Sequence, residues 1–427
     1  MRPWVAPTPA GPVTGALTVP GSKSATARGY VLAALGDGPS VLTGVLDARD
    51  TRLMRQGLAG LGVTFASVPG VPDAVRITPP EEFRASHVEC GPAGTIMRFV
   101  PPLSALAHGA TAFTGDPEAS VRPVGPLLDG LAQAGVRIEN PGRPGVAPTA
   151  VPFSVVGSGA VPGGEVRIDA SASSQFVSGL LLSAARFTEG LSLTHAGARV
   201  PSAPHIALTL AMLADRGVVA SASDHTWRVE PGPIAARDEA IEPDLINAAV
   251  FLAAALVTGG SVTVGWPRHT AQAGEVILGT LTALGGHVQG GDDTVTVRGT
   301  GVITGADLDL SHASELTCVA ASLLALADRP GRIRGVGHIR HHETDRLAAL
   351  EAELGARGAG VAQTSDGLTV RPAPLSGGPW HTYADHRMAH AGAVLGLAVP
   401  GITLDDVDAT TKTLADFAGL WHHLVAA

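Results

Sequence analysis

Residues 244–266, DLINAAVFLAAALVTGGSVTVGW, carry the pattern that organises the rest of the chain. The segment starts at a polar residue, continues as an alanine- and leucine-rich stretch, is interrupted by two glycines and ends in alternating β-branched residues. This order predicts a helix that begins near Asp244 and a strand that follows it. The helical part is apolar on nearly every side, so we expect the helix to be buried.

The same pattern occurs five more times, with starts roughly 70 to 80 residues apart along the 427 residues. A second helix and a strand are predicted after each copy, except after the last, where the strand is missing. The chain is therefore predicted to be an α/β (α+β) protein built from six strand–helix–strand–helix–strands units, three in each of two domains. The further copies occupy residues 24–45, 93–115, 173–196, 314–336 and 384–407.

Composition narrows the class of protein. Hydrophobic residues make up 45% of the chain and charged residues 16%, as in globular proteins that are not disordered. Cysteine occurs only at positions 90 and 318, so we expect a reducing, cytoplasmic location, with no disulfide framework and no metal site. The longest apolar run is too short for a membrane span. A net charge of −9 argues against nucleic acid as a partner, but a few cations in a cleft can still bind a small anion.

Polar and charged residues gather where the buried helices are expected to start. Free N–H groups at several helix starts, with cations beside them, would form an anion-binding site. The simpler alternative is that each serine or aspartate is an ordinary N-cap. Six similar starts, several of which carry cations, favour the site.

The chain has two lysines, Lys23 and Lys412, and both are expected at helix entries. A lysine is a compact charge whose pKa responds to burial, so arginine does not replace it where a proton or a single phosphate contact is needed. The alternative is that two lysines survive by chance in a genome that prefers arginine codons. Arg122, followed by Pro123, is also expected at a helix entry, where an arginine is unfavourable unless an anion is present.

Acidic residues among these cations suggest proton transfer. Glu315 is expected in the first turn of a buried helix, where it is either a favourable dipole residue or a general base. Asp385, His386 and Arg387 start another apolar helix. They are either a buried ion pair or an arginine that holds a phosphate or carboxylate beside a titratable histidine.

Together these motifs resemble the EPSP synthase family (3-phosphoshikimate 1-carboxyvinyltransferases) over essentially the full length. The resemblance rests on eight motifs in family order: PGSKSATAR, GPAGTIMRF, GDPEASVRPVGPL, SSQF, PSAPHI, HETDRL, DHRMA and TTKT. It implies a two-domain, inside-out α/β barrel-like fold with six βαβαββ units and an interdomain cleft. The implied domains are residues 1–19 plus 240–427, which is discontinuous, and residues 20–239.

The resemblance also implies the reaction. The enolpyruvyl group of phosphoenolpyruvate is transferred to the 5-hydroxyl of shikimate 3-phosphate by addition and elimination, in the pathway to chorismate and the aromatic amino acids. It implies no cofactor and no metal, a cytoplasmic monomer, no nucleic-acid or membrane partner, and an enzyme of the class that glyphosate targets.

Site residues follow from the matched positions. The residues implied to bind shikimate 3-phosphate are Lys23, Ser24, Arg28, Ser173, Ser174 and Ser202, with Gln175 at the junction of the two substrates. Those implied to bind phosphoenolpyruvate are Lys23, Gly94, Arg122, Arg346, Arg387 and Lys412. The residues implied to be catalytic are Glu315, which takes the proton of the attacking hydroxyl, and Lys23, Glu343 and His386, which move protons at the enol carbon.

Several positions depart from the usual family pattern. Glu315 replaces the usual aspartate, and His342 replaces a lysine at a substrate-binding position. The remaining departures are Pro92 for asparagine, His205 for tyrosine, His338 for asparagine and Phe99 for proline. Two alternatives stay open: a UDP-N-acetylglucosamine 1-carboxyvinyltransferase, whose family uses a loop cysteine that residues 114–125 do not contain, and a non-catalytic anion-binding homologue.

Overall fold

The computed structural model describes residues 2–426 and confirms the α/β class and both helices of all six repeats. The first helices are α1 (Lys23–Leu35), α3 (Gly94–Ser104), α5 (Ser174–Ala184), α7 (Leu245–Thr258), α9 (Thr317–Ala325) and α11 (His386–Gly396). The second helices are α2 (Arg49–Gly60), α4 (Gly125–Gln133), α6 (Pro204–Ala214), α8 (Gly274–Ala283), α10 (Arg346–Arg357) and α12 (Phe417–Ala426). Three short 3₁₀ helices are η1 (Ser314–Leu316), η2 (Gly337–His341) and η3 (Val407–Lys412).

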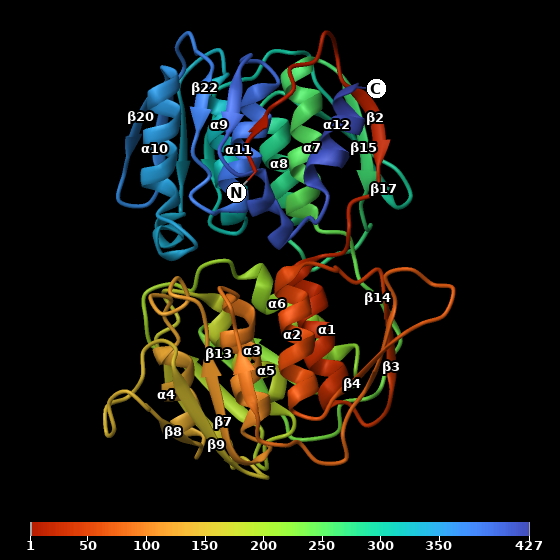
Figure 1. The fold of residues 1–427 in the computed structure, drawn as a ribbon, viewed down its shortest axis with the longest axis vertical. Helices are drawn as coiled ribbons and strands as arrows, with labels where there is room; N and C mark the ends of the chain where they lie inside the picture. Colours follow the sequence, from red (N-terminus) through yellow and green to blue (C-terminus); the bar gives the residue numbers. More distant parts are fainter. Residues whose placement is uncertain (1, 427) are drawn as a thin grey trace. The chain divides into compact units, whose positions relative to one another are not determined.

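The chain divides into two compact units, each with three repeats. Unit 1 comprises Met1–Pro20 and Pro243–Ala427, and unit 2 comprises Gly21–Glu242. In unit 1 the first helices α7, α9 and α11 contact one another, and in unit 2 α1, α3 and α5 do the same (Figure 1). Nearly every residue of these six helices is buried, which confirms the prediction from their all-round apolar surface.

Within residues 2–426 the strands form six sheets, three in each unit. The sheets of unit 2 have the orders β14 (Glu239–Ala240), β3 (Ser40–Thr43), β5 (Val75–Thr78), β4 (Thr64–Ser67); β6 (His87–Glu89), β7 (His108–Thr114), β9 (Phe153–Ser158), β8 (Arg137–Glu139); and β10 (Gly164–Ile168), β11 (Leu191–His195), β13 (Thr226–Val229), β12 (Ala220–Ser223). Those of unit 1 have the orders β16 (His287–Gly290), β17 (Thr294–Arg298), β15 (Ser261–Gly265), β2 (Thr14–Leu17); β18 (Asp307–Asp309), β19 (Gly331–Arg334), β21 (Leu368–Arg371), β20 (Gly360–Gln363); and β1 (Trp4–Val5), β23 (Ile402–Leu404), β22 (Gly378–Trp380).

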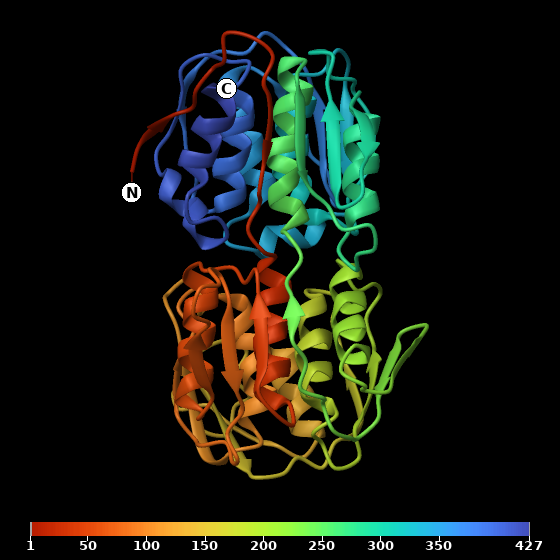
Figure 2. The same ribbon diagram turned by 90° about the vertical axis from the view of Figure 1, so that its right-hand side faces the viewer.

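Two strands, β2 and β14, pair in one unit although the helix that follows each of them along the chain belongs to the other unit. In four repeats the strand before the buried helix pairs in parallel with the strand after it, as β6 does with β7. The strand β2 leads along the chain into α1 of unit 2 but pairs with β15 of unit 1. Conversely, β14 leads into α7 of unit 1 but pairs with β3 of unit 2. Figure 2 shows the red N-terminal segment running along the green and blue elements of unit 1.

Candidate functional site

In unit 2, the start of α3 has no side-chain cap and lies against two arginines. The cap position is Ala93, which offers no acceptor. A Cβ atom built on Gly94 would lie 2.7 Å from Nη2 of Arg122 and 2.9 Å from Nη1 of Arg98, so both guanidiniums reach the first residue of the helix. Arg122 is held there because its Nη1 donates to the carbonyl of Pro92 at 2.7 Å. Cations at the positive end of a helix dipole repel it, so this arrangement favours an anion.

Lys23 is the first residue of α1, as predicted, and its ammonium lies 3.6 Å from the carboxylate of Asp50 on α2. The side chain of Asp50 is 2% exposed, so Lys23 has a buried counter-charge. Ser22 caps the helix by accepting the N–H of Ala25, and Ser24 is half-buried in the first turn. The sequence does not mark Asp50 as a site residue, since an acid in the first turn of an amphipathic helix is common.

Arg28 points into unit 2 rather than away from it. Its Nε donates to Oγ1 of Thr209 at 2.7 Å, and its Nη2 donates to Oγ of Ser178 and to the carbonyl of His205 at 3.2 and 2.9 Å. Its Nη1 donates to the carbonyl of Ser24 at 3.0 Å. Burial lowers the pKa of Arg28 to about 9. In this structure Arg28 joins α1 to α5 and α6.

The serines implied to bind phosphate lie at the starts of α5 and α6. Ser173 is the N-cap of α5 and accepts the N–H of Gln175 at 3.2 Å, so the simpler alternative describes Ser173 correctly. Ser174 is the first, buried residue of that helix, and Oε1 of Gln175 accepts from Nη1 of Arg98 at 2.7 Å. Ser202 has a φ of 50°, a left-handed conformation that is unfavourable for serine and is enriched at functional sites.

His195 links the segment that leads to Ser173 with the segment that leads to Ser202. Its Nδ1 accepts the N–H of Ala170 at 3.0 Å and lies 3.4 Å from the N–H of Gly197. Nδ1 is therefore unprotonated, which agrees with a pKa that burial lowers. Ala170 precedes Ser173 and Gly197 precedes Ser202, so one ring nitrogen holds both segments. Nothing in the sequence around His195 marks it.

In unit 1, four charged side chains form a connected chain. Arg346, at the start of α10, donates Nε and Nη2 to the two carboxylate oxygens of Asp385 at 2.8 and 3.1 Å. Its Nη2 also donates to Glu343 at 2.8 Å, and Glu343 forms an ion pair with Lys412. Asp385 in addition accepts the backbone N–H of Arg387 at 2.8 Å and caps α11. The buried ion pair and the cap considered for Asp385 are both present, although its partner is Arg346.

The surroundings shift the pKa values of the buried groups in this region in different directions. Burial opposes the charge of Arg346, but Asp385 and Glu343 overcome that effect and raise its pKa above the ordinary value. Burial lowers the pKa of Arg387. Burial and the charge of Arg346, which donates to Nδ1 of His342 at 3.1 Å, lower the pKa of His342 well below 6.5. His342 is thus a weaker base than an ordinary histidine, at the position where the resemblance implied a lysine.

Glu315 lies in η1, directly ahead of α9, and is half-buried. Its Oε2 is 3.4 Å from the hydroxyl of Ser314. His386 is the first residue of α11, is 3% exposed, and has Nδ1 3.6 Å from Asp385.

The turn before His386 contains two consecutive left-handed residues, Tyr383 and Ala384, with φ of 55° and 53°. Tyr383 donates its hydroxyl to Glu353 at 2.8 Å, which helps to hold this turn.

Two local expectations are wrong. Lys412 does not start a helix: it is the last residue of η3 and is 2% exposed, five residues ahead of α12. Pro123 does not lie in the first helical turn, because α4 begins at Gly125 and has Pro126 in its first turn. The sequence predicted that Lys412 and Arg122 lie near helices. It did not predict that Lys412 ends the 3₁₀ helix η3 or that α4 begins at Gly125.

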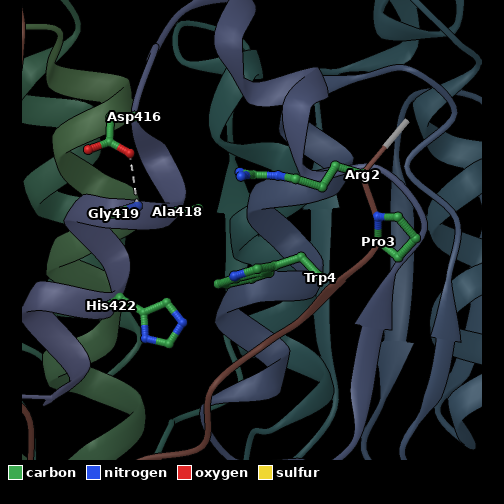
Figure 3. A pocket seen from close by; sticks show the side chains of 7 residues that line it. All are labelled: Arg2, Pro3, Trp4, Asp416, Ala418, Gly419 and His422. Carbon is green, nitrogen blue, oxygen red and sulfur yellow. Dashed lines mark hydrogen bonds between the residues drawn. The ribbon is translucent and has the colours of Figure 1, made fainter.

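A separate hollow of about 380 Å³ lies in unit 1 between the N-terminal segment and the start of α12 (Figure 3). None of the predicted site residues lines it. Its lining residues are Arg2, Pro3, Trp4, Asp416, Ala418, Gly419 and His422. Within residues 2–426, no group of three or more histidine, cysteine, aspartate or glutamate side chains could hold a metal ion. In the same part of the chain, every helix is too short or too polar to cross a bilayer.

Solved structures share this fold. An EPSP synthase from Acinetobacter baumannii superposes with a TM-score of 0.82 at 20% identity, covering 99% of this chain and 97% of that one. The enolpyruvyl transferase NikO from Streptomyces tendae superposes with a TM-score of 0.75 at 18% identity, covering 99% and 97%. The class of protein is therefore that of the two-domain, inside-out α/β enolpyruvyl transferase fold.

Sequence comparison defines the family more narrowly. The family model for EPSP synthase (3-phosphoshikimate 1-carboxyvinyltransferase) matches residues 7–421. A 3-phosphoshikimate 1-carboxyvinyltransferase from Kocuria rhizophila is 49% identical over 436 aligned residues, covering 99% of this chain and 97% of the relative. The chain belongs to the EPSP synthase family.

Proposed function

We propose that the chain transfers the enolpyruvyl group of phosphoenolpyruvate to the 5-hydroxyl of shikimate 3-phosphate, giving 5-enolpyruvylshikimate 3-phosphate and phosphate. Family membership over nearly the full length supports this reaction. The structural observation that carries it is the uncapped start of α3 with Arg122 and Arg98 beside it, because two guanidiniums at a positive helix end favour an anionic ligand there.

In this proposal phosphoenolpyruvate is bound by the backbone of Gly94 and by four cations, Arg122, Arg346, Arg387 and Lys412. Arg122 and Arg387 each have a buried Nε without an acceptor among residues 2–426, a feature that they share with Arg216 and Arg357. Shikimate 3-phosphate is bound by Lys23, Ser24, Arg28, Ser173, Ser174, Gln175 and Ser202.

The proton transfers follow from the chemistry of addition and elimination. Glu315 accepts the proton of the attacking 5-hydroxyl, so that the oxygen can bond to C2 of phosphoenolpyruvate. C3 gains a proton in the addition and loses one when phosphate leaves. We assign these steps to Lys23, Glu343 and His386. The ion pair of Glu343 with Lys412 supports its part in this assignment, because it gives the carboxylate a partner for proton exchange.

The alternative acceptor is a UDP-sugar. The two cysteines, Cys90 and Cys318, are both buried, and burial raises the pKa of each thiol, so neither has the reactivity of the loop cysteine in that related family. We further propose a cytoplasmic monomer that acts without a cofactor.

Phosphate release with phosphoenolpyruvate plus either shikimate 3-phosphate or UDP-N-acetylglucosamine tests the function, with NMR to identify the enol ether product. We expect turnover when the acceptor is shikimate 3-phosphate and none when it is the UDP-sugar. Turnover only with the UDP-sugar would establish the alternative enzyme, and binding without turnover would establish the non-catalytic homologue.

A further inference from the structure

A buried amide in unit 1 links the guanidinium of Arg387 to the backbone next to Lys412. Asn247 lies in the first turn of α7 and is 1% exposed. Its Oδ1 accepts from Nη1 of Arg387 at 2.8 Å, and its Nδ2 donates to the carbonyl of Thr413 at 3.2 Å. A guanidinium can only donate and a carbonyl can only accept, so the two partners fix the orientation of the amide.

This amide closes a ring of interactions. From Arg387 the ring runs through its backbone N–H to Asp385, and from Asp385 to Arg346. It continues through Glu343 to Lys412, whose neighbour Thr413 returns to Asn247. Asn247 is the uncharged side chain in this ring. It couples the position of the Arg387 guanidinium to that of the segment that carries Lys412.

We propose that Asn247 is a positioning residue for phosphoenolpyruvate, which sets the spacing of Arg387 and Lys412 without neutralising either. This inference rests on the proposed function. A neutral acceptor holds a guanidinium and leaves its positive charge available to an anion, whereas a carboxylate at the same place would compete with the substrate. An apolar side chain would leave Nη1 of Arg387 and the Thr413 carbonyl without their partner.

Two substitutions separate these effects. Asn247→Leu keeps the branched shape of the side chain and removes both hydrogen bonds. Asn247→Asp keeps the acceptor, removes the donor and adds a negative charge. Thr258→Val is a matched control at the other end of α7, because it removes the hydrogen bond from the backbone N–H of Val13 to Oγ1 of Thr258, remote from the ring along the helix.

Steady-state kinetics of the three full-length variants test the proposal, with circular dichroism to confirm folding. We expect KM for phosphoenolpyruvate to rise at least tenfold in Asn247→Leu and further in Asn247→Asp, with KM for shikimate 3-phosphate within twofold of wild type. Thr258→Val should lose thermal stability and keep both KM values. If Asn247→Leu does not fold, Asn247→Asp together with direct titration of phosphoenolpyruvate decides the question.

The inference is overturned if the folded Asn247 variants keep the wild-type KM for phosphoenolpyruvate, or if both KM values rise equally, which would indicate a general structural role. These outcomes differ from failure of the proposed function, in which the wild-type protein itself would show no shikimate 3-phosphate-dependent phosphate release.

Discussion

Replacing Gly94 by alanine tests whether the start of α3 is a tightly fitted anion site. The added Cβ would lie 2.7 Å from Nη2 of Arg122 and 2.9 Å from Nη1 of Arg98, where ordinary contact begins at 3.4 Å. The Arg122 guanidinium must therefore retreat by about 0.7 Å, the difference between 2.7 and 3.4 Å, against its hydrogen bond to Pro92. A misplacement of about 1 Å can cost about 10²-fold in rate.

We therefore expect kcat/KM for phosphoenolpyruvate to fall by about 10- to 100-fold in Gly94→Ala, which corresponds to about 1.4 to 2.7 kcal/mol. The assay is phosphate release with phosphoenolpyruvate varied at saturating shikimate 3-phosphate, then the reverse. KM for shikimate 3-phosphate should rise less, because the added Cβ acts on that ligand set through the bond of Arg98 to Gln175 and not through the serines at the starts of α5 and α6.

Gly355→Ala is the matched control, since a Cβ at this exposed position of α10 would meet nothing within 4 Å. It should keep wild-type kinetics and gain up to about 1 kcal/mol of stability. Equal kinetics for Gly94→Ala and Gly355→Ala would refute the reasoning, since they would show that Arg122 and Arg98 need not approach the helix start.

Three further changes address the chemistry and the core. Glu315→Gln keeps the shape of the side chain and removes the base, so kcat should fall about 10²- to 10⁴-fold. Both substrates should still bind in a calorimetric titration. Unchanged turnover would exclude Glu315 as the general base. Lys412→Arg keeps the charge, but it puts a larger, planar guanidinium at a buried position against Glu343, so kcat/KM for phosphoenolpyruvate should fall at least about tenfold. Wild-type kinetics would leave codon preference as the explanation for this lysine. His390 is fully buried and burial lowers its pKa well below 6.5. The unfolded chain therefore binds an extra proton below about pH 6.5, and stability should fall with acidification by up to about 1.4 kcal/mol per pH unit for this group. Denaturation of His390→Met between pH 7.5 and 5.5 should show a shallower dependence than wild type, and parallel curves would contradict this.

The repeats were predictable because each buried helix is apolar on nearly every side and is followed by glycine and β-branched residues. Those local signals specify helix and strand positions without tertiary information. The helix starts also brought Lys23, Gly94, Ser174 and His386 to the expected ends of their helices.

The side-chain partners were not predictable. Asp50, His195 and Asn247 act through contacts with residues far away in sequence, and their local surroundings resemble ordinary helix turns or strand ends. Arg28 was implied as a substrate ligand, yet nothing local indicated that its donors meet Thr209 and Ser178. Sequence patterns therefore predicted which charged residues lie at helix starts. They did not predict the hydrogen-bond and ion-pair partners of these residues, because those partners depend on how the repeats pack against one another.

The exchange of β2 and β14 affects the order in which the chain can fold during synthesis. All of Gly21–Glu242 has been made when unit 2 is ready to fold, and its β14 is the last strand to arrive. By contrast, β2 must wait for β15, and β1 must wait until Leu404 has been made to pair with Trp4. Until their partner strands have been made, β1 and β2 have unpaired edges while unit 2 is already complete. Unpaired strand edges expose a nascent chain to misassembly. A circular permutant that begins at residue 243 and carries residues 1–20 after residue 427 would make unit 1 contiguous and shorten that wait.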